Sequence, residues 1–533
     1  IANTGLTTPL VVLSLTLFAL LLFSGLLNAM RIHLMEIFGR RFYARMVAEI
    51  SMRSIFAQNP FFNDQSRGAL FNRYFDIITV QKTMPVLFIG GFTVILQSAV
   101  GFVLVSMYHP LFLAFNIVMV LLIWAVWLIW GAAAVRSAID LSHRKYQTAA
   151  WLEGIGGSDG FFKSERRIDY ALKATDDRTA DYVEQHRRHF RRHFSQTLAF
   201  LVLYAGASAM LLGLGGWLVI QGQLTLGQLV AAELILSAVF FGVSQLGIYL
   251  NYIYDLCAAV EELSLFYDVD QEQTRDGAGS RTDDPTLSFI DVRGAARGRP
   301  VRLDFEIPGG QGVMVAAYNH GVQRLFTNML KRHQSPEGGY VLFGGVDLSS
   351  IDSHRLRQDV FVLDRPSFMS MTIREYLEVS AEDSDPRCLI KALDTVGLAP
   401  VIAQLEEGLD TLIASTGWPL SVPETMQLKL AGALLARPSI LVLGQVFDAV
   451  GEITLAAAVR EIREDPSISV VYFSNRSSSL DFDSFLYMGE TAQIYFDDFD
   501  KFYEHTRSNA DPRRQSPRLI HIQSPPQIGR HDP

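Results

Sequence analysis

Five long apolar segments dominate the first half of the chain and limit the folds that are open to it. They lie at about residues 9–30, 86–107, 111–134, 196–220 and 225–250. Each segment is long enough to cross a hydrocarbon core of about 30 Å as an α-helix. The mean hydropathy of the 533-residue chain, +0.20, agrees with a membrane-embedded part. We therefore predict an all-α transmembrane domain over residues 1–268, and not a set of buried core helices in a large soluble protein.

Basic side chains indicate how these spans are oriented. Residues 31–85 contain eight Lys and Arg side chains and residues 136–196 contain twelve, whereas the short connections 108–110 and 221–224 contain none. Because Lys and Arg are enriched in cytoplasmic connections, the two basic segments should face the cytoplasm. This orientation places residue 1 on the opposite side, and we expect one further span before Ile1.

Proline spacing predicts helices that are much longer than a membrane is thick. No proline lies between Pro9 and Pro60, and none lies between Leu111 and Asp284. A helix from Pro9 to Gln58 would be about 75 Å long at ~1.5 Å per residue, and only about 30 Å of it can lie in lipid. The helices should therefore continue into the cytoplasm, with a turn at GIGGSDGFF, 154–162.

Two polar features of the membrane half allow more than one interpretation. The segment HRRHFRRHF, 186–194, lies directly before the fourth span. We interpret it as a basic anchor at the lipid headgroups and not as a histidine metal site. Glu233 lies inside the fifth span, where a carboxylate is either a functional group or one end of a hydrogen bond between helices.

The second half of the chain has the composition of a soluble α/β domain. A linker over 269–286, rich in charged and turn-forming residues, separates it from the membrane half. Within 287–505, short β-rich runs alternate with helical stretches, at 312–318, 340–344, 359–363, 439–444 and 469–473. This order predicts a mainly parallel sheet covered by helices. The tail 506–533 is rich in Pro, Arg and Ser, and we expect it to be disordered.

Charge and cysteine content exclude several classes of function. The net charge of −9 does not favour nucleic acid as a partner. The two cysteines, Cys257 and Cys388, lie in different halves of the chain. They imply neither a disulfide framework nor a cysteine metal site, which fits a soluble domain in the cytoplasm.

Four segments, taken in order, resemble the ATP-binding cassette (ABC) exporters over essentially the whole chain. NPFFNDQSRGALFNRYFDI, 59–77, resembles the first coupling loop of that family through Pro60, Phe61, Phe62, Asp64, Gly68, Arg73 and Asp76. The segments 338–377, 408–421 and 430–443 resemble the hairpin-to-Q-loop stretch, the approach to the ABC signature, and the signature helix with its Walker B strand.

The resemblance implies an exporter-type transmembrane domain followed by an α/β P-loop-like cassette domain. It implies a multi-pass protein of the cell (inner or plasma) membrane with its cassette in the cytoplasm. It also places coupling residues in two loops, at Pro60, Phe61, Phe62, Asp64, Gly156 and Phe161.

The resemblance places the P-loop at AYNHGVQR, with the candidate residues Asn319, His320, Gly321, Gln323 and Arg324. A working loop has the pattern G-x-x-x-x-G-K-[ST]. Its backbone N–H groups hold phosphate, its Lys reaches the β- and γ-oxygens, and its hydroxyl holds Mg²⁺. Here Gln323 stands for the Lys and Arg324 for the hydroxyl, while Gly321 remains in the loop. We therefore do not expect ATP or Mg²⁺ as a cofactor.

The other nucleotide loops depart from the family pattern in parallel. Gly444 and Gln445 stand for the two Walker B acids, and Asn475 stands for the switch histidine. The remaining departures are Asp364 at the Q-loop glutamine, Ser421 and Glu424 in the altered signature LSVPE, Gly451 at the D-loop aspartate, and Ala296 at the adenine-stacking aromatic. Loss of one acid–base group costs about 10²–10⁴-fold in rate. We therefore expect no intact catalytic residue and no metal site, although the apolar framework of a cassette is kept.

These features predict a subunit of an exporter-like transport complex that relies on a partner for energy. The partner would be a second ABC half or a second copy of this chain, with membrane lipid around both. Components of a secretion complex are a further class that the sequence leaves open. Two alternatives stay open as well: a non-transporting membrane scaffold or regulator, and a sensor that binds ATP without hydrolysis through Arg324 or His320. The sequence does not identify a substrate.

Overall fold

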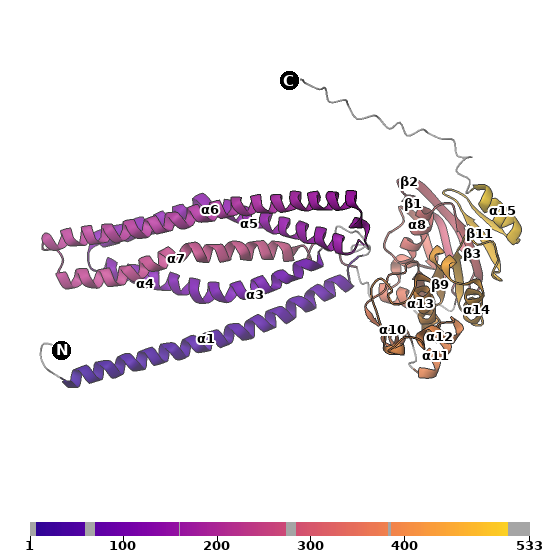
Figure 1. Ribbon diagram of the computed structural model, residues 1–533, viewed down its shortest axis with the longest axis horizontal. Helices are drawn as coiled ribbons and strands as arrows, with labels where there is room; N and C mark the ends of the chain where they lie inside the picture. The colour runs from indigo at the N-terminus through magenta and orange to yellow at the C-terminus, as the bar shows by residue number, and fades with distance from the viewer. Residues whose placement is uncertain (1–6, 59–69, 159, 273–283, 382–384, 510–533) are drawn as a thin grey trace, which may run out of the picture. The chain divides into compact units, whose positions relative to one another are not determined.

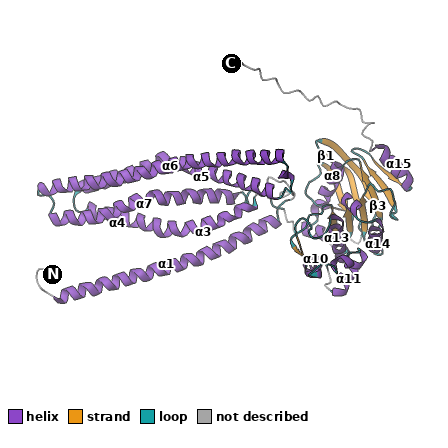
Figure 2. Ribbon diagram, viewed as in Figure 1, coloured by secondary structure: helices purple, strands orange, loops and turns teal. Residues whose placement is uncertain are grey.

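The computed structural model describes residues 7–58, 70–158, 160–272, 284–381 and 385–509. The chain divides into two units, Ile1–Gln271 and Glu272–Pro533, and the division falls inside the predicted linker. Figure 2 shows that the first unit is helical and that the second combines strands with helices. We call them the helical unit and the cassette unit, and each is described by itself.

The helical unit consists of long helices joined by short connections (Figure 1). Its elements are α1 (Thr7–Ile55), η3 (Phe71–Phe75), α3 (Asp76–Val86), η4 (Leu87–Gly91), α4 (Phe92–Ser106), α5 (Pro110–Gly156), η5 (Phe161–Lys163), α6 (Glu165–Ile220) and α7 (Leu226–Ser264). Among the described residues, five helical stretches are long and apolar enough to cross a membrane. They coincide with the five predicted spans.

The lengths of α1, α5 and α6 confirm that these helices extend beyond the membrane. They contain 49, 47 and 56 residues, which corresponds to about 70–85 Å at ~1.5 Å per residue. The predicted turn is present between Gly156, where α5 ends, and Glu165, where α6 begins. Toward its N-terminus α1 leaves the other helices, and residues 11–30 are exposed (Figure 1).

The helix that enters the second span changes its winding at Pro85. Proline lacks a backbone N–H and crowds the preceding turn, and the turn that follows it, η4, is a π-helix. Gly90 in η4 lies against α7: a Cβ at this position would be 2.5 Å from the Tyr249 hydroxyl oxygen. A residue with a Cβ would therefore require the Tyr249 ring to shift.

The cytoplasmic ends of α1, α3 and α7 form a packed node with its own apolar core. The buried members of this core are Ile50, Ala57, Leu70, Ile77, Val80, Ala259, Leu263, Phe266 and Val269. Charged groups fasten it: Arg73 Nε lies 2.9 Å from the fully buried Glu262 carboxylate. Asp76 accepts a hydrogen bond from the Tyr146 hydroxyl at 2.6 Å and pairs with Lys145 Nζ at 3.2 Å. Arg73 and Asp76, noted in the sequence as family-like, therefore tie the segment after residues 59–69 to α5 and α7.

The cassette unit contains two main sheets. Its elements are β1 (Leu287–Ala296), β2 (Arg299–Ile307), β3 (Gly312–Ala317), α8 (His320–Leu330), β4 (Gly338–Phe343), β5 (Val346–Asp347), η6 (Leu348–Ser350), α9 (Ser353–Asp359), β6 (Val360–Leu363), β7 (Met371–Thr372), α10 (Ile373–Ser380), α11 (Pro386–Thr395), α12 (Ala399–Ile402), η7 (Gly408–Asp410), β8 (Leu412–Ile413), α13 (Val422–Ala436), β9 (Ile440–Leu443), η8 (Gln445–Ala449), α14 (Glu452–Arg463), β10 (Ser469–Phe473), β11 (Ser484–Met488), β12 (Gln493–Phe496) and α15 (Phe499–Asn509).

The larger sheet has six strands in the order β12-β11-β3-β10-β9-β6, and every neighbouring pair except β11–β12 is parallel. Both faces are buried. Leu441 and Leu443 of β9 pack in a core with α11, α13 and α14, whereas Ile440 and Val442 face a second core with α8. This two-sided burial explains the continuous apolar runs in the sequence.

Two sequence predictions about this unit need correction. The run at 340–344 does not join the parallel sheet: β4 lies in a four-stranded sheet of order β2-β1-β4-β5, whose pairs are antiparallel. Composition does not distinguish the two kinds of strand, because β4 is also partly buried. The predicted disordered tail begins too early, since α15 extends to Asn509. Residues 510–533 lie outside the described part of the chain.

Removing one partner of the buried Arg73–Glu262 pair should destabilise the helical unit. Arg73→Met leaves the Glu262 carboxylate buried without its cation, and we expect a loss of about 3–5 kcal/mol in unfolding free energy. The measurement is denaturant unfolding of the full chain in detergent, followed by circular dichroism. Arg73→Met/Glu262→Leu should recover most of the loss. Arg40→Met, in an exposed pair with Glu36, is the control, and an equal loss in this control would contradict the assignment.

Candidate functional site

The segment predicted as a P-loop is a short connection into a capped helix. Only Tyr318 and Asn319 separate β3 from α8, which begins at His320. The side-chain oxygen of Asn319 accepts a hydrogen bond from the Val322 N–H at 3.1 Å, which is an ordinary N-cap. Gly321 therefore lies in the first turn of α8 and not in a loop, contrary to the sequence prediction. The Val322 N–H is therefore bonded to Asn319, whereas a phosphate-binding loop would direct such an N–H at its ligand.

The side chains around this connection point in different directions. Gln323 is buried, whereas His320 and Arg324 are exposed. The Asn319 amide donates a hydrogen bond to the Glu490 carboxylate at 3.3 Å. This places an anion beside the start of α8, where a phosphate group would be repelled.

Gly444 lies where two parallel strands end side by side. Its N–H donates to the Leu363 carbonyl at 2.8 Å, and a Cβ at Gly444 would lie 2.9 Å from the Asp364 Cα. Because that neighbour is a backbone atom, an aspartate does not fit here unless the end of β6 shifts. Gln445, directly after it, is exposed in η8.

Asp364 is held by a lysine, and a second lysine holds the residues that follow it. Lys331 Nζ, just beyond α8, lies 2.7 Å from the Asp364 carboxylate. Lys429 Nζ, on α13, donates to the carbonyl oxygens of Arg365 at 2.8 Å and Ser367 at 2.6 Å. Burial lowers the pKa of Lys429, so these bonds compensate an amine that is largely removed from water. The two lysines together tie the segment after β6 to α8 and α13.

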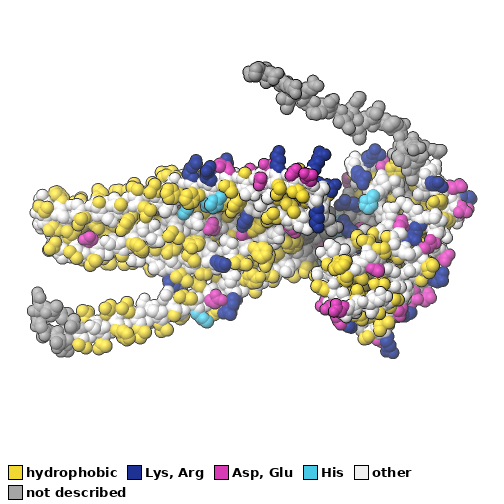
Figure 3. Space-filling view, viewed as in Figure 1, with side chains coloured by type: hydrophobic (Ala, Val, Ile, Leu, Met, Phe, Trp, Pro, Cys, Tyr) yellow, Lys and Arg dark blue, Asp and Glu magenta, His cyan; other side chains and the backbone are white. Residues whose placement is uncertain are grey.

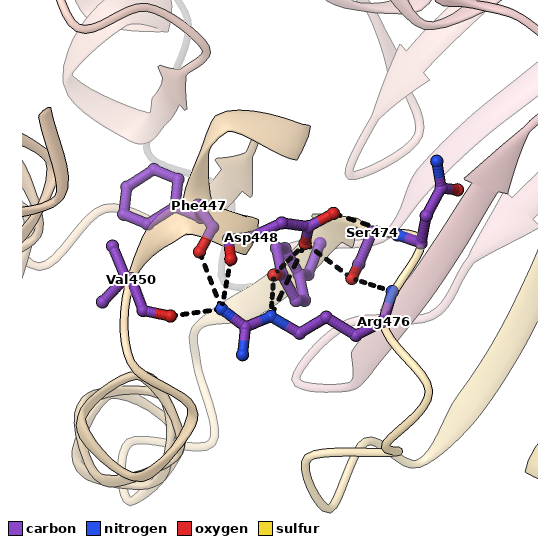
Figure 4. A network of polar contacts seen from close by, with 7 residues as sticks. Phe447, Asp448, Val450, Ser474 and Arg476 are labelled. Atoms are coloured by element: carbon purple, nitrogen blue, oxygen red, sulfur yellow. Dashed lines mark hydrogen bonds and ion pairs between the residues drawn. The ribbon is translucent and has the colours of Figure 1, made fainter.

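A polar network joins the segments that follow β9 and β10 (Figure 4). The Asp448 carboxylate accepts hydrogen bonds from the Tyr472 hydroxyl at 2.5 Å, the Ser474 hydroxyl at 2.7 Å and the Asn475 N–H at 3.1 Å. Burial, and then the bond to Asp448, raise the pKa of Tyr472. Asn475 contributes its backbone, while its side chain is exposed.

Arg476 completes this network from the strand β10 side. Its guanidinium donates to the carbonyl oxygens of Phe447 at 3.1 Å, Asp448 at 2.9 Å and Val450 (Figure 4). Its side chain is only 13% exposed. One cation thus satisfies three carbonyls of the segment after β9 and fixes its path relative to β10.

The two signature residues bond to each other. The Ser421 N–H and hydroxyl donate to the Glu424 carboxylate at 2.7 and 2.6 Å, and the Glu424 N–H is directed back at the Ser421 oxygen at 3.5 Å. This capping box closes the N-terminus of α13. The carboxylate also neutralises the positive end of the helix dipole, which would otherwise favour an anion.

Of the predicted coupling residues, the structure describes two. Gly156 ends α5, and Phe161 lies in η5, 54% exposed, with the Arg167 guanidinium carbon 4.2 Å from its ring centroid. Pro60, Phe61, Phe62 and Asp64 lie outside the described residues. Elsewhere in the helical unit, Glu233 is exposed on α7 and has no hydrogen-bond partner among the described residues.

Four residues that hold the site together were missed by sequence reasoning. They are Lys331, Lys429, Asp448 and Arg476. Asp448 and Arg476 each lie within five residues after a buried strand, and the ends of parallel strands meet at one edge of the sheet. That position is a usable signal for Asp448 and Arg476. No comparable pattern marks the two lysines.

Loss of the Arg476 guanidinium should destabilise the cassette unit strongly. Arg476→Met leaves three carbonyls and the Asp448 carboxylate without their cation, and we expect a loss of about 2–4 kcal/mol in unfolding free energy. Thermal unfolding of the full chain in detergent measures it. Arg460→Met, in an exposed pair with Asp481, is the matched control and should change stability little. Similar unfolding temperatures for the two variants would contradict the role given to Arg476.

Acid should destabilise the cassette unit through His333, beside the Lys331–Asp364 pair. Burial, and then the charges of Lys331 and Arg357, lower the pKa of His333 to about 4. Since the unfolded residue titrates near pH ~6.5, the unfolded state takes up the proton first, and stability falls as pH decreases from about 6.5 to 4. His333→Gln should flatten this part of the pH–stability profile and match the wild type's slope at pH 8. An unchanged acid limb in the variant would refute the assignment.

Comparison with known proteins agrees with this architecture. No protein-family model matches the chain. The probable multidrug resistance ABC transporter ATP-binding/permease protein YheI of Bacillus subtilis is 26% identical over 279 residues, which cover 51% of this chain and 47% of YheI. The uncharacterized ABC transporter ATP-binding protein YfiC of Bacillus subtilis is 22% identical over 427 residues, 76% of this chain and 69% of YfiC. The chain therefore spans about half the length of YheI.

A third relative and a solved structure complete the comparison. The leukotoxin translocation ATP-binding protein LktB of Mannheimia haemolytica is 26% identical over 245 residues, 45% of this chain and 34% of LktB. The structure of a bacterial Atm1-family ABC exporter with ATP bound superposes with a TM-score of 0.80 at 18% identity, and covers 95% of this chain and 92% of that one. The chain thus has the fold of an ABC exporter half-transporter, with a multi-pass membrane domain followed by a cassette domain.

Proposed function

We propose that this chain is a subunit of an ABC-exporter-like transport complex that does not hydrolyse ATP itself and takes its energy from a partner subunit. The observation that carries the proposal is the set of internal ties at the cassette edge. Asp448 with Arg476, Lys331 with Asp364, and Lys429 with the carbonyls after Asp364 join segments that a nucleotide would otherwise join.

The residues at this edge do not fit ATP and Mg²⁺. Metal binding would need a carboxylate near Gly444, where a Cβ meets the Asp364 backbone. Phosphate binding would need free N–H groups and a cation, whereas the Val322 N–H is capped by Asn319 and Glu490 places a carboxylate beside it. Arg324 carries charge but is exposed on the first turns of α8. We therefore assign no step to a bound nucleotide in this chain.

The exporter class of the proposal comes from the fold and from the relatives. YheI is named a probable multidrug resistance transporter and LktB a leukotoxin translocation protein, so drugs and a toxin are both open as classes of cargo. In the helical unit, the Arg73–Glu262 ion pair holds together the packed node that follows residues 59–69 in the sequence. A rigid node is what a subunit needs if movement produced by its partner is to reach its membrane helices.

A non-transporting scaffold or regulator is the second candidate. The same internal ties favour it, because a cassette fixed in one arrangement presents a constant surface to other proteins. The two candidates differ in one respect: a transport subunit must change the activity of the complex when it is removed, whereas a scaffold need change only its assembly.

The test uses the native complex, purified through this chain and reconstituted in nanodiscs with its partner. We expect no ATPase activity from this chain alone and the same unfolding temperature with and without millimolar Mg-ATP. The ATPase and transport rates of the complex should fall when this subunit is omitted. Gln445→Ala in this chain should leave the ATPase rate of the complex unchanged. Replacement by alanine of the partner's acid at the matching position should abolish that rate. Hydrolysis by this chain alone, or transport that survives its deletion, would refute the proposal.

A further inference from the structure

The segment HRRHFRRHF on α6 has two faces with different surroundings. On one face His189 is buried and lies 3.1 Å from the Ser137 hydroxyl of α5, and Arg192 donates to the Ala133 carbonyl at 2.8 Å. Gln196 on the same face is fully buried and accepts a hydrogen bond from the Tyr254 hydroxyl of α7 at 2.7 Å. This face holds α6 against its neighbours. Among the described residues, no group of three or more potential metal ligands forms.

The opposite face combines two exposed arginines with two stacked aromatic rings. Phe190 and Phe194 are 54% and 53% exposed, and their ring centroids lie 5.5 Å apart. Arg187 and Arg191 are exposed on the same face, and neither forms an ion pair within the described part of the chain. Because residues three or four apart share a helix face, these four side chains form one continuous patch, which we call the Arg–Phe patch.

The Arg–Phe patch continues directly into an exposed apolar surface of the predicted span. Leu198 and Val202 follow on the same face, 50% and 64% exposed. Figure 3 shows that basic side chains gather on α6 where the mainly hydrophobic surface begins. Arg191 lies five residues before the predicted start of the span, or about 8 Å along the helix, which is the depth of the headgroup layer. Alternating arginine and phenylalanine side chains are therefore followed by aliphatic side chains across the expected membrane boundary.

We propose that the Arg–Phe patch binds the headgroup phosphate of an anionic phospholipid in the cytoplasmic leaflet. Guanidinium groups form paired, charge-assisted hydrogen bonds to phosphate oxygens, and Arg187 and Arg191 are both free to do so. Phe190 and Phe194 occupy the level at which aromatic side chains prefer the boundary between headgroups and acyl chains. A soluble phosphate would use the arginines but would leave the aromatic and aliphatic surface exposed, so the observations favour a lipid.

Arg166 and Lys173 provide a matched control on the same helix. Both are exposed, lie on the same face as Arg187, and form no ion pair within the described residues. They lie 21 and 14 residues before Arg187, or about 30 and 20 Å farther from the membrane, beyond the ~10 Å over which salt screens charge. Removing these two charges changes the net charge by the same amount as removing Arg187 and Arg191. The basic residues at the membrane boundary are left unchanged.

The experiment measures lipids bound to the full chain in nanodiscs of phosphatidylcholine and phosphatidylglycerol, by native mass spectrometry. We expect the wild type to enrich phosphatidylglycerol, and Arg187→Gln/Arg191→Gln to lower this enrichment about tenfold. Arg166→Gln/Lys173→Gln should retain it. Arg187→Lys/Arg191→Lys keeps the charge but loses the paired guanidinium bonds, so we expect an enrichment between those of the wild type and Arg187→Gln/Arg191→Gln. Circular dichroism of each variant checks that the helices still fold.

Three outcomes would overturn the proposal. Equal enrichment in the wild type and Arg187→Gln/Arg191→Gln would show that these arginines bind no headgroup. An equal loss in Arg166→Gln/Lys173→Gln would show an effect of net charge only. Displacement of phosphatidylglycerol by 10-fold lower amounts of inorganic phosphate would show an anion site that does not require a membrane. None of these readouts depends on transport or on ATP.

Discussion

The parallel pairing of β6, β9, β10 and β3 brings the ends of four strands to one edge of the cassette sheet, and the candidate site depends on that pairing. The residues that follow these strands are Asp364, Gly444, Ser474 and Tyr318. In sheets of this kind the edge at the carboxyl ends is where ligands usually bind. Here the space between neighbouring strand ends is so small that Gly444 packs against the backbone of Asp364.

Charges placed at such an edge need partners, because burial without one is costly. In a nucleotide-binding protein the phosphates and the metal would supply some of those partners. In this chain Arg476 pairs with Asp448 and donates hydrogen bonds to three backbone carbonyls. Lys331 forms an ion pair with Asp364. The strands β9 and β10 beneath this edge are buried along their whole length. Two-sided burial holds these strands together, whereas the polar side chains at their ends determine what this edge can bind.

The features predicted well from the sequence are those that depend on local patterns. Uniform apolar runs gave the five membrane helices and strands such as β9 and β10, because each run is buried or lipid-facing along its whole length. The same runs place Gly444 and Asn475 just after buried strands, since β9 ends at Leu443 and β10 at Phe473. The sheet to which β4 belongs could not be predicted, since parallel and antiparallel strands have similar compositions. The start of α8 was missed because Gly321 was interpreted as a loop residue, while the Asn319 cap that starts the helix earlier was not considered.

Contacts between distant segments explain what the sequence could not provide. Lys429 and Ser367 are 62 residues apart, and Arg476 and Asp448 are 28 apart, so no local periodicity relates them. The same is true in the helical unit, where Glu262 of α7 meets Arg73 across 189 positions of the chain. A buried ion pair of this kind contributes less to stability than apolar packing of the same volume, but it accepts few alternative arrangements. In both units, then, long-range polar contacts fix which segments lie together, and apolar packing supplies most of the stability. Under the function proposed above, such contacts would let a partner displace the helices as preformed parts, without rearrangement of the cassette loops of this chain.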